Sequence, residues 1–270
     1  MKKKFCHILF LTIASTFLVS CASVPVTNRR QLDLVPGSMM LLTGFKQYDD
    51  FLKTHHLSSN QQQTQMVKSV GAKIQEAVEQ YMADNNLSGR LRNYQWEFNL
   101  VEGQEANAWC MSGGKVVVYT GILPVTQDEN GLAVVMGHEI AHAIARHGEE
   151  RMSQFLLTDM GGRTLSAALS DSPKQTQQLW LTAFGIGSQV GFLLPYSRLH
   201  ESEADRLGLI FIAMAGYNPD KAVEFWERMS MSKEKQSKRL AEFLSTHPSD
   251  QKRIQQIKTY LPEAMNYYKR

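Results

Sequence analysis

The stretch that decides the fold is residues 132–145, LAVVMGHEIAHAIA. Apart from His138, Glu139 and His142 its side chains are small or apolar, which is typical of a helix buried in a protein core. The two histidines stand four residues apart, so they project from one face of that helix and can reach one tetrahedral Zn²⁺. Glu139 is offset by one position, which predicts a general base beside the metal rather than a ligand.

A zinc ion held by two histidines needs a third protein ligand if the fourth position is kept for water. The segment 200–205, HESEAD, supplies the candidate, because Glu201 and Asp205 are spaced i, i+4 and share a helix face. We predict Glu201 as the third ligand and Asp205 as the partner that fixes the tautomer of a ligating histidine. On its own this segment would read as a solvated acidic stretch, so the prediction depends on the histidine pair.

The rest of the sequence predicts a predominantly helical α+β domain. Alternating apolar residues over 94–100, then residues 107–111 and the β-branched run 115–120, predict a small antiparallel sheet. Thr126 is expected to cap the buried helix, with Glu129 completing a capping box. Helical spacing dominates over about 39–82, 149–169, 174–194, 197–215, 220–231 and 251–260.

The chain opens with a charge pattern typical of export. Three lysines precede an apolar run over residues 5–19, which is shorter than the roughly 20 residues of a transmembrane helix. We interpret residues 1–20 as a lipoprotein signal peptide, because Cys21 follows the run in the position of a bacterial lipidation site. Residues 21–36 would then be a lipidated tether, and residues 37–270 one zinc metallopeptidase domain.

Net charge and cysteine content give no support for a nucleic-acid-binding protein or for a protein held together by disulfides. The 29 basic and 26 acidic residues give a net charge of +3, and the three lysines of the signal account for all of it. This balance gives no argument for a nucleic-acid partner. Of the 3 cysteines, one lies in the signal and one is Cys21, so Cys110 remains alone and no disulfide framework is predicted.

Ala22 stands where aspartate would resemble an inner-membrane retention signal, which favours the outer membrane.

Further motifs accompany the two that bind the predicted metal, namely residues 107–123, residues 194–198 and Thr246-His247-Pro248. In this order, they resemble the zinc metallopeptidase family that contains the CAAX prenyl endopeptidases and the HtpX-type heat-shock proteases, peptidase family M forty-eight. The sequence is most similar to its periplasmic lipoprotein branch, the LoiP and BepA type, from about Leu32 to Ile257. This sequence lacks the tetratricopeptide repeats of BepA-type members and the membrane spans of the HtpX and CAAX branches. Partner docking through such repeats, cleavage of membrane substrates and prenyl processing are therefore not expected.

The resemblance implies a zincin fold of the gluzincin type, with one Zn²⁺ per chain held by His138, His142 and Glu201. It also implies an edge strand along the active-site helix that binds an extended substrate through its backbone. This role falls to Asn107, Gly114, Lys115, Val116, Val117 and Val118.

His247 matches a family histidine near the metal. It could donate a hydrogen bond to the oxyanion of the tetrahedral intermediate. It could instead occupy the position of the water and make the enzyme latent, or be a loop histidine in a turn with Pro248. Arg253 follows closely and is a candidate partner for a carboxylate such as Asp205.

We therefore expect a zinc endopeptidase that hydrolyses unfolded or misassembled envelope proteins by metal-activated water and serves protein quality control. Its expected location is the bacterial cell envelope, lipid-anchored in the outer membrane and facing the periplasm. Its expected partners are polypeptide substrates and the membrane, with no nucleic acid. The alternatives are a latent or non-catalytic zinc-binding chaperone or assembly lipoprotein, and a purely structural lipoprotein.

Overall fold

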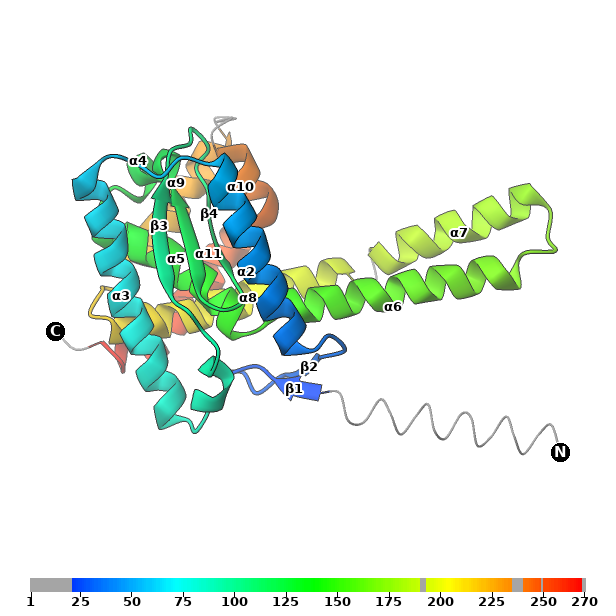
Figure 1. The fold of residues 1–270 in the computed structure, drawn as a ribbon, viewed down its shortest axis with the longest axis horizontal. Coiled ribbons are helices and arrows are strands. Elements are labelled where there is room, and N and C mark those ends of the chain that lie inside the picture. Colours follow the sequence, from blue (N-terminus) through cyan, green and yellow to red (C-terminus); the bar gives the residue numbers. More distant parts are fainter. Residues whose placement is uncertain (1–20, 190–192, 235–239, 249, 269–270) are drawn as a thin grey trace. The chain divides into compact units, whose positions relative to one another are not determined.

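The computed structural model describes residues 21–189, 193–234, 240–248 and 250–268 (Figure 1). The predicted signal peptide, residues 1–20, lies outside the described residues. The chain divides into two compact units. The larger unit comprises residues 40–145 and 197–270, and the smaller one comprises residues 1–39 and 146–196.

A three-stranded sheet in the order β3-β5-β4 lies in the larger unit. Its central strand β5 (Lys115–Tyr119) runs parallel to β3 (Glu97–Val101) and antiparallel to β4 (Ala108–Met111). β4 joins β5 through a tight turn at Gly113 and Gly114, whose positive φ angles of 99° and 85° suit glycine. The α+β class is confirmed, but the β3–β5 pair is parallel, where the sequence predicts an antiparallel sheet.

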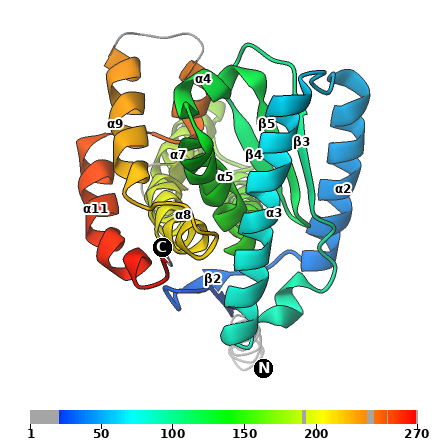
Figure 2. The ribbon, with the colours of Figure 1, turned by 90° about the vertical axis from the view of Figure 1, so that its left-hand side faces the viewer.

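Helices cover both faces of this sheet (Figure 2). On one face, α2 (Gly37–Thr54) brings Tyr48 into a buried cluster with Val117 of the central strand. On the other face, α3 (Gln61–Asp84) packs against β3, and α5 (Glu129–Ile144) packs against β4. The helix that carries the histidine motif is therefore buried between a sheet and other helices.

The C-terminal part of the larger unit is helical. α9 (Lys221–Glu234) packs against both α5 and α11 (Gln251–Met265). α10 (Ala241–Thr246), which is only six residues long, has too few helical repeats to be recognised in the sequence. The other helical elements are η1 (Ser88–Leu91), η2 (Thr120–Ile122), α4 (Leu123–Thr126) and α8 (Leu194–Met214).

The start of α5 differs from the prediction. Asp128, not Thr126, is the N-cap, and its Oδ1 accepts a hydrogen bond of 2.8 Å from the amide of Gly131. Thr126 instead ends the short helix α4, where its hydroxyl donates to the carbonyl of Leu123 at 3.1 Å. The predicted capping box is therefore not formed, because Thr126 belongs to α4 and the residue three positions after the actual N-cap is Gly131, which has no side chain.

The described part of the smaller unit includes β1 (Cys21–Ser23), β2 (Arg30–Leu32), α6 (His147–Ala168) and α7 (Lys174–Ser188). β1 and β2 pair antiparallel, and α6 and α7 lie side by side in Figure 1. Arg29 donates to Glu150 of α6 through two bonds of 2.9 and 2.6 Å. Residues 21–36, predicted as a tether, are thus held against α6. None of the helices in the described ranges has the length and apolar character to span a membrane.

Candidate active site

α5 places the histidine motif in the protein interior. His138 and Glu139 are 2% and 5% exposed, and His142, one turn later, is partly exposed. The Nε2 atoms of His138 and His142 lie 3.1 Å apart, as the i, i+4 spacing predicts. Both imidazoles therefore turn to the same point.

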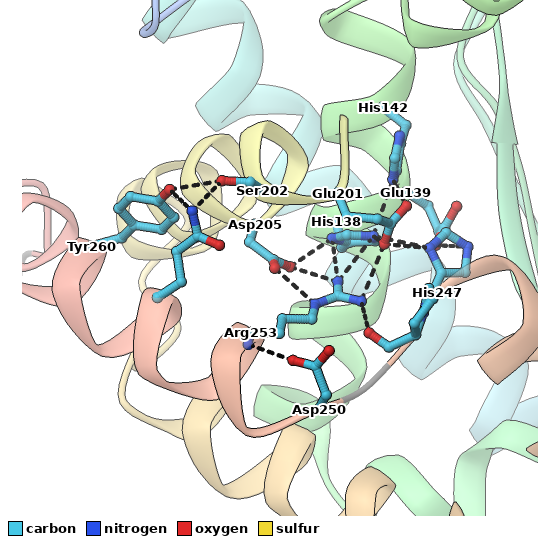
Figure 3. A network of polar contacts seen from close by, with 12 residues as sticks. His138, Glu139, His142, Glu201, Ser202, Asp205, His247, Asp250, Arg253 and Tyr260 are labelled. Atoms are coloured by element: carbon cyan, nitrogen blue, oxygen red, sulfur yellow. Dashed lines mark hydrogen bonds and ion pairs between the residues drawn. The ribbon is translucent and has the colours of Figure 1, made fainter. Parts of the chain in front are cut away.

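Glu201 of α8 reaches this point from the other side (Figure 3). Its Oε1 lies 3.2 Å from Nε2 of His142, and its Oε2 lies 3.3 Å from Nε2 of His138. The fold thus brings the three predicted ligands together, although Glu201 lies far from the histidines in the sequence.

His247 follows directly after α10 and joins the same group. Its Nδ1 lies 3.1 Å from Nε2 of His138 and 3.0 Å from Oε2 of Glu201, and its Nε2 lies 3.4 Å from Oε1 of Glu139. With 12% of its side-chain surface exposed, it is not a loop histidine apart from the site. These distances agree with both roles that the resemblance implies.

Asp205, one turn after Glu201, holds His138 from behind. Nδ1 of His138 lies 2.9 Å from Oδ1 of Asp205, which leaves Nε2 of the imidazole facing the cluster. Nε and Nη2 of Arg253 in α11 also donate to this carboxylate, each at 2.8 Å. Burial would raise the pKa of Asp205, but Arg253 and His138 lower it below its usual value. The sequence's suggested pairing of Arg253 with Asp205 is present.

Burial and hydrogen bonding oppose each other in this cluster. Burial would lower the pKa of His138, but hydrogen bonds to Asp205 and Glu201 outweigh it and raise that pKa to about 9. Burial would raise the pKa of Glu201, but hydrogen bonds from the surrounding histidines hold it well below its usual range. Burial raises the pKa of Glu139, against the opposing effect of the nearby histidines. Glu201 is therefore a permanent carboxylate, whereas Glu139 is better suited to take up a proton.

The donor set fits a zinc ion. One ligand atom from each of His138, His142, Glu201 and His247 lies within 4.8 Å of all the others. Imidazole nitrogens with one carboxylate are a common catalytic zinc environment. Oε1 of Glu139 is buried without a hydrogen-bond partner in the part of the chain that the structure describes. Buried carboxylate oxygens normally have a donor, and a water in this cluster would supply one.

The predicted substrate-binding strand is not at the sheet edge. Gly114, Lys115 and Val116–Val118 are predicted to lie there, but β5 is paired on both sides and the three valines are fully buried. Nζ of Lys115 donates to Glu97 at 3.0 Å and lies over the ring of Tyr48, so it faces α2. The parallel pairing of β3 with β5 is the physical reason, because it covers the edge that β5 would otherwise expose.

β4 is the edge strand along α5, and among the described residues β5 is its only strand neighbour. Asn107, a predicted substrate contact, lies immediately before it, and its Oδ1 accepts from the amide of Ala108 at 2.9 Å. Cys110 lies on β4, where burial and the nearby Glu139 raise the pKa of its thiol. The edge strand of the predicted fold is present, but β4 provides it.

Trp226 belongs to the site although no sequence motif includes it. This residue of α9 is 2% exposed, and its ring centroid lies 3.4 Å from Cζ of Arg253 and 5.9 Å from the ring of His138. A tryptophan on the apolar side of a helix is ordinarily a core residue. No sequence signal connects it to the metal-binding motifs, because only tertiary packing brings them together.

The fold and the cluster together define a zincin-type metallopeptidase domain. A model of peptidase family M48 matches residues 68–261, which include every residue of the cluster. The chain therefore belongs to peptidase family M48.

Several curated relatives are similar to this chain. The mitochondrial metalloendopeptidase OMA1 of Schizosaccharomyces pombe is 40% identical over 174 residues, which are 64% of this chain and 49% of that protein. Its counterpart in Saccharomyces cerevisiae is 30% identical over 283 residues, which are 98% and 76%. The beta-barrel assembly-enhancing protease of Escherichia coli is 30% identical over 163 residues, which are 59% and 33%. The chain thus spans less than two thirds of the first and the third of these relatives.

The predicted location in a bacterial outer membrane is wrong on this comparison. The relatives that align over most of the chain are named as mitochondrial enzymes. The prediction rested on charge and apolar length in residues 1–21, a pattern too short to separate one targeting system from another. Lipidation of Cys21 stays a prediction.

Proposed function

We propose that the protein is a zinc-dependent endopeptidase that hydrolyses unfolded or misassembled polypeptides. The observation that carries this proposal is the convergence of His138, His142 and Glu201 with the carboxyl of Glu139 beside them. Membership of a metallopeptidase family and the metalloendopeptidase names of the OMA1 relatives support it.

The residues of the cluster divide the chemistry among them. Zn²⁺ held by His138, His142 and Glu201 would supply Lewis-acid polarisation of the scissile carbonyl and lower the pKa of water. Glu139 would take the proton of the attacking water and deliver it to the leaving amine, and its raised pKa suits this transfer. Asp205 holds Nδ1–H of His138 and so presents the other ring nitrogen to the metal.

His247 would stabilise the oxyanion. An imidazole donor aimed at a developing negative charge contributes about 3 kcal/mol in comparable sites. Its position 3.4 Å from Glu139 places it next to the reacting groups. The alternative assigns His247 to the position of the water and makes the enzyme latent, and its Nδ1 lies 3.1 Å from His138.

Substrate would bind as an extra strand on β4. β4 packs against α5 and among the described residues has a strand neighbour on one side only, so we expect an extended peptide paired with its other side to run beside the helix of the cluster. Main-chain pairing favours extended segments over folded ones and tolerates many side chains. The name of the Escherichia coli relative links that protein to β-barrel assembly, which supports a role in removing misassembled proteins. Because the bacterial outer-membrane location is wrong, the proposed substrates are not restricted to bacterial envelope proteins.

The test compares the full-length protein with its Glu139→Gln variant in cleavage of casein, with bound zinc quantified in both. We expect about 10²–10⁴-fold slower cleavage with zinc retained, because Glu139 acts on protons and is not a ligand. Glu263→Gln, which removes a partly exposed carboxylate paired with Arg206, is the matched control and should keep full activity.

Three outcomes would reject the proposal. Equal cleavage by the wild type and Glu139→Gln would show that Glu139 has no chemical role. No cleavage by either protein, with zinc bound to both, would favour the latent or non-catalytic zinc-binding chaperone. Absence of zinc from both would favour a structural protein.

A further inference from the structure

Arg253 connects separate parts of the candidate site (Figure 3). Its Nε and Nη2 each donate to Asp205 at 2.8 Å, and its Nη1 lies 3.1 Å both from Oε2 of Glu201 and from the carbonyl oxygen of Pro248. Asp205 and Glu201 belong to α8, whereas Pro248 directly follows His247. The guanidinium side chain is 7% exposed, so these bonds form away from bulk water and are strong.

The flat face of this guanidinium rests on Trp226. The separation of 3.4 Å between Cζ and the ring centroid is that of a close cation–π contact. Trp226 stacks in turn on Phe243 of α10, and the ring of Phe243 lies 4.7 Å from that of His247. One aromatic support thus underlies both Arg253 and His247.

We propose that Arg253 is a positioning residue that sets His138 and His247 at the same time. Through Asp205 it fixes the orientation of the His138 ring. Through the carbonyl of Pro248 it holds the segment that carries His247 beside the cluster. The proposal rests on the metallopeptidase function proposed above. Arginine suits this task because its planar fork donates in several directions at once, which a lysine ammonium does not reproduce.

A second arginine links the same two helices and serves as an internal comparison. Arg206 of α8 donates to Glu263 of α11 at 2.6 and 2.9 Å, and both side chains are partly exposed. If Arg253 merely tied α11 to α8, loss of either arginine should have similar consequences. A positioning role predicts instead that only Arg253 controls metal affinity and turnover.

The experiment uses the full-length protein with Arg253→Ala, Arg253→Lys and the matched controls Arg206→Ala and Arg206→Lys. The zinc dissociation constant is measured by competition with a chromophoric chelator, and kcat and KM are measured on a fluorogenic peptide. We expect Arg253→Ala to weaken zinc binding and to lower kcat by about 10–100-fold each, with KM little changed. The Arg206 variants should stay within about twofold of the wild type.

Chemical rescue adds a readout that a general loss of stability would not give. Guanidinium ion at low, non-denaturing concentration should restore zinc affinity and kcat in Arg253→Ala, because it can refill the site on Trp226. It should not restore them in Arg253→Lys, whose ammonium occupies the site.

Three results would overturn the inference and leave the proposed function standing. One is wild-type zinc affinity and kcat in Arg253→Ala. Another is a loss in Arg253→Ala that Arg206→Ala matches. If circular dichroism shows that Arg253→Ala does not fold, zinc affinity and kcat are measured in Arg253→Lys instead. Wild-type values in Arg253→Lys would overturn the inference, whereas losses of about 10–100-fold would support it. A wild-type protein that binds no zinc would overturn the proposed function together with this inference. Failure of the inference alone can therefore be distinguished from failure of the proposed function.

Discussion

Gly208 of α8 lies directly against the backbone of Gly137 of α5. A Cβ atom added to Gly208 would stand 3.1 Å from the carbonyl carbon and oxygen of Gly137 and 3.1 Å from the amide nitrogen of His138. The missing side chain therefore permits two helix backbones to touch. That contact sets the separation of α5 and α8, and hence the reach of Glu201 and Asp205 toward His138.

Replacement of Gly208 by alanine should therefore destabilise the protein. In an unhindered helix alanine would be favoured by about 1 kcal/mol over glycine. Here the new methyl group meets backbone atoms, so the helices must move apart, and we expect a net loss of about 1–3 kcal/mol. Urea unfolding measures the loss, and a zinc titration should show weaker binding.

Gly185→Ala is the control for this prediction, because an added Cβ at this helical glycine meets nothing within 4 Å. It should leave the free energy of unfolding unchanged or raise it. A Gly208→Ala variant as stable as the wild type, with unchanged zinc binding, would show that the crossing accommodates a methyl group.

Removal of the metal should lower the thermal stability of the protein. A ligand that binds only the folded state at a thousand times its dissociation constant adds about 4 kcal/mol to the free energy of unfolding. We expect the melting temperature to rise with added zinc and to fall with a chelator. His142→Ala should abolish this response while it remains folded, and an unchanged zinc response in that variant would remove His142 from the ligand set.

Asp205→Asn should weaken zinc binding without removing a ligand. The substitution keeps the size of the side chain but replaces the charged acceptor of the His138 Nδ1–H bond. Loss of such an outer partner typically costs about 10–100-fold in metal affinity. Chelator competition measures the change, with Glu263→Gln as the control at a partly exposed ion pair. Wild-type zinc affinity in Asp205→Asn would mean that the carboxylate of Asp205 pairs with Arg253 but does not affect zinc binding through His138.

Substrate pairing with β4 predicts a period-two response to backbone methylation. Successive N–H groups of an extended strand point to opposite sides, so only alternate amides of a substrate can bond to one edge. N-methylation of a peptide at those positions should lower kcat/KM by about tenfold, which corresponds to one lost hydrogen bond. Methylation at the intervening positions is the control. Equal effects at neighbouring positions would argue against strand pairing.

The sequence contained most of the site because its key spacings are local. His138 and His142 share a helix turn, and so do Glu201 and Asp205, so helix geometry alone predicts which side chains face together. What spacing could not show is that the two helices meet, which depends on the contact of Gly137 with Gly208. The place of Trp226 in the site cannot be predicted from spacing either, because only tertiary packing brings it there.

The fold was less predictable where pairing is non-local. Alternation of apolar residues marks β3 and β5 as strands, but it is the same for parallel and antiparallel partners. The pairing of Leu100 with Val118 therefore has no signature in the sequence, and the prediction of the central strand as the edge strand is wrong. The short helix α4 likewise displaced the start of α5 to Asp128 as N-cap.

The contact of Arg253 with His138 spans 115 positions of the chain. During synthesis the helix that carries His138 is made long before α11, so a growing chain has the histidine motif without the network that orients it. The same holds for a chain whose α11 has opened. Under the proposed function, such a chain is itself an unfolded polypeptide of the kind that the enzyme cuts. If Arg253 orients the cluster as proposed, this topology would confine peptidase activity to chains that have finished folding, so that incomplete chains would not cut one another.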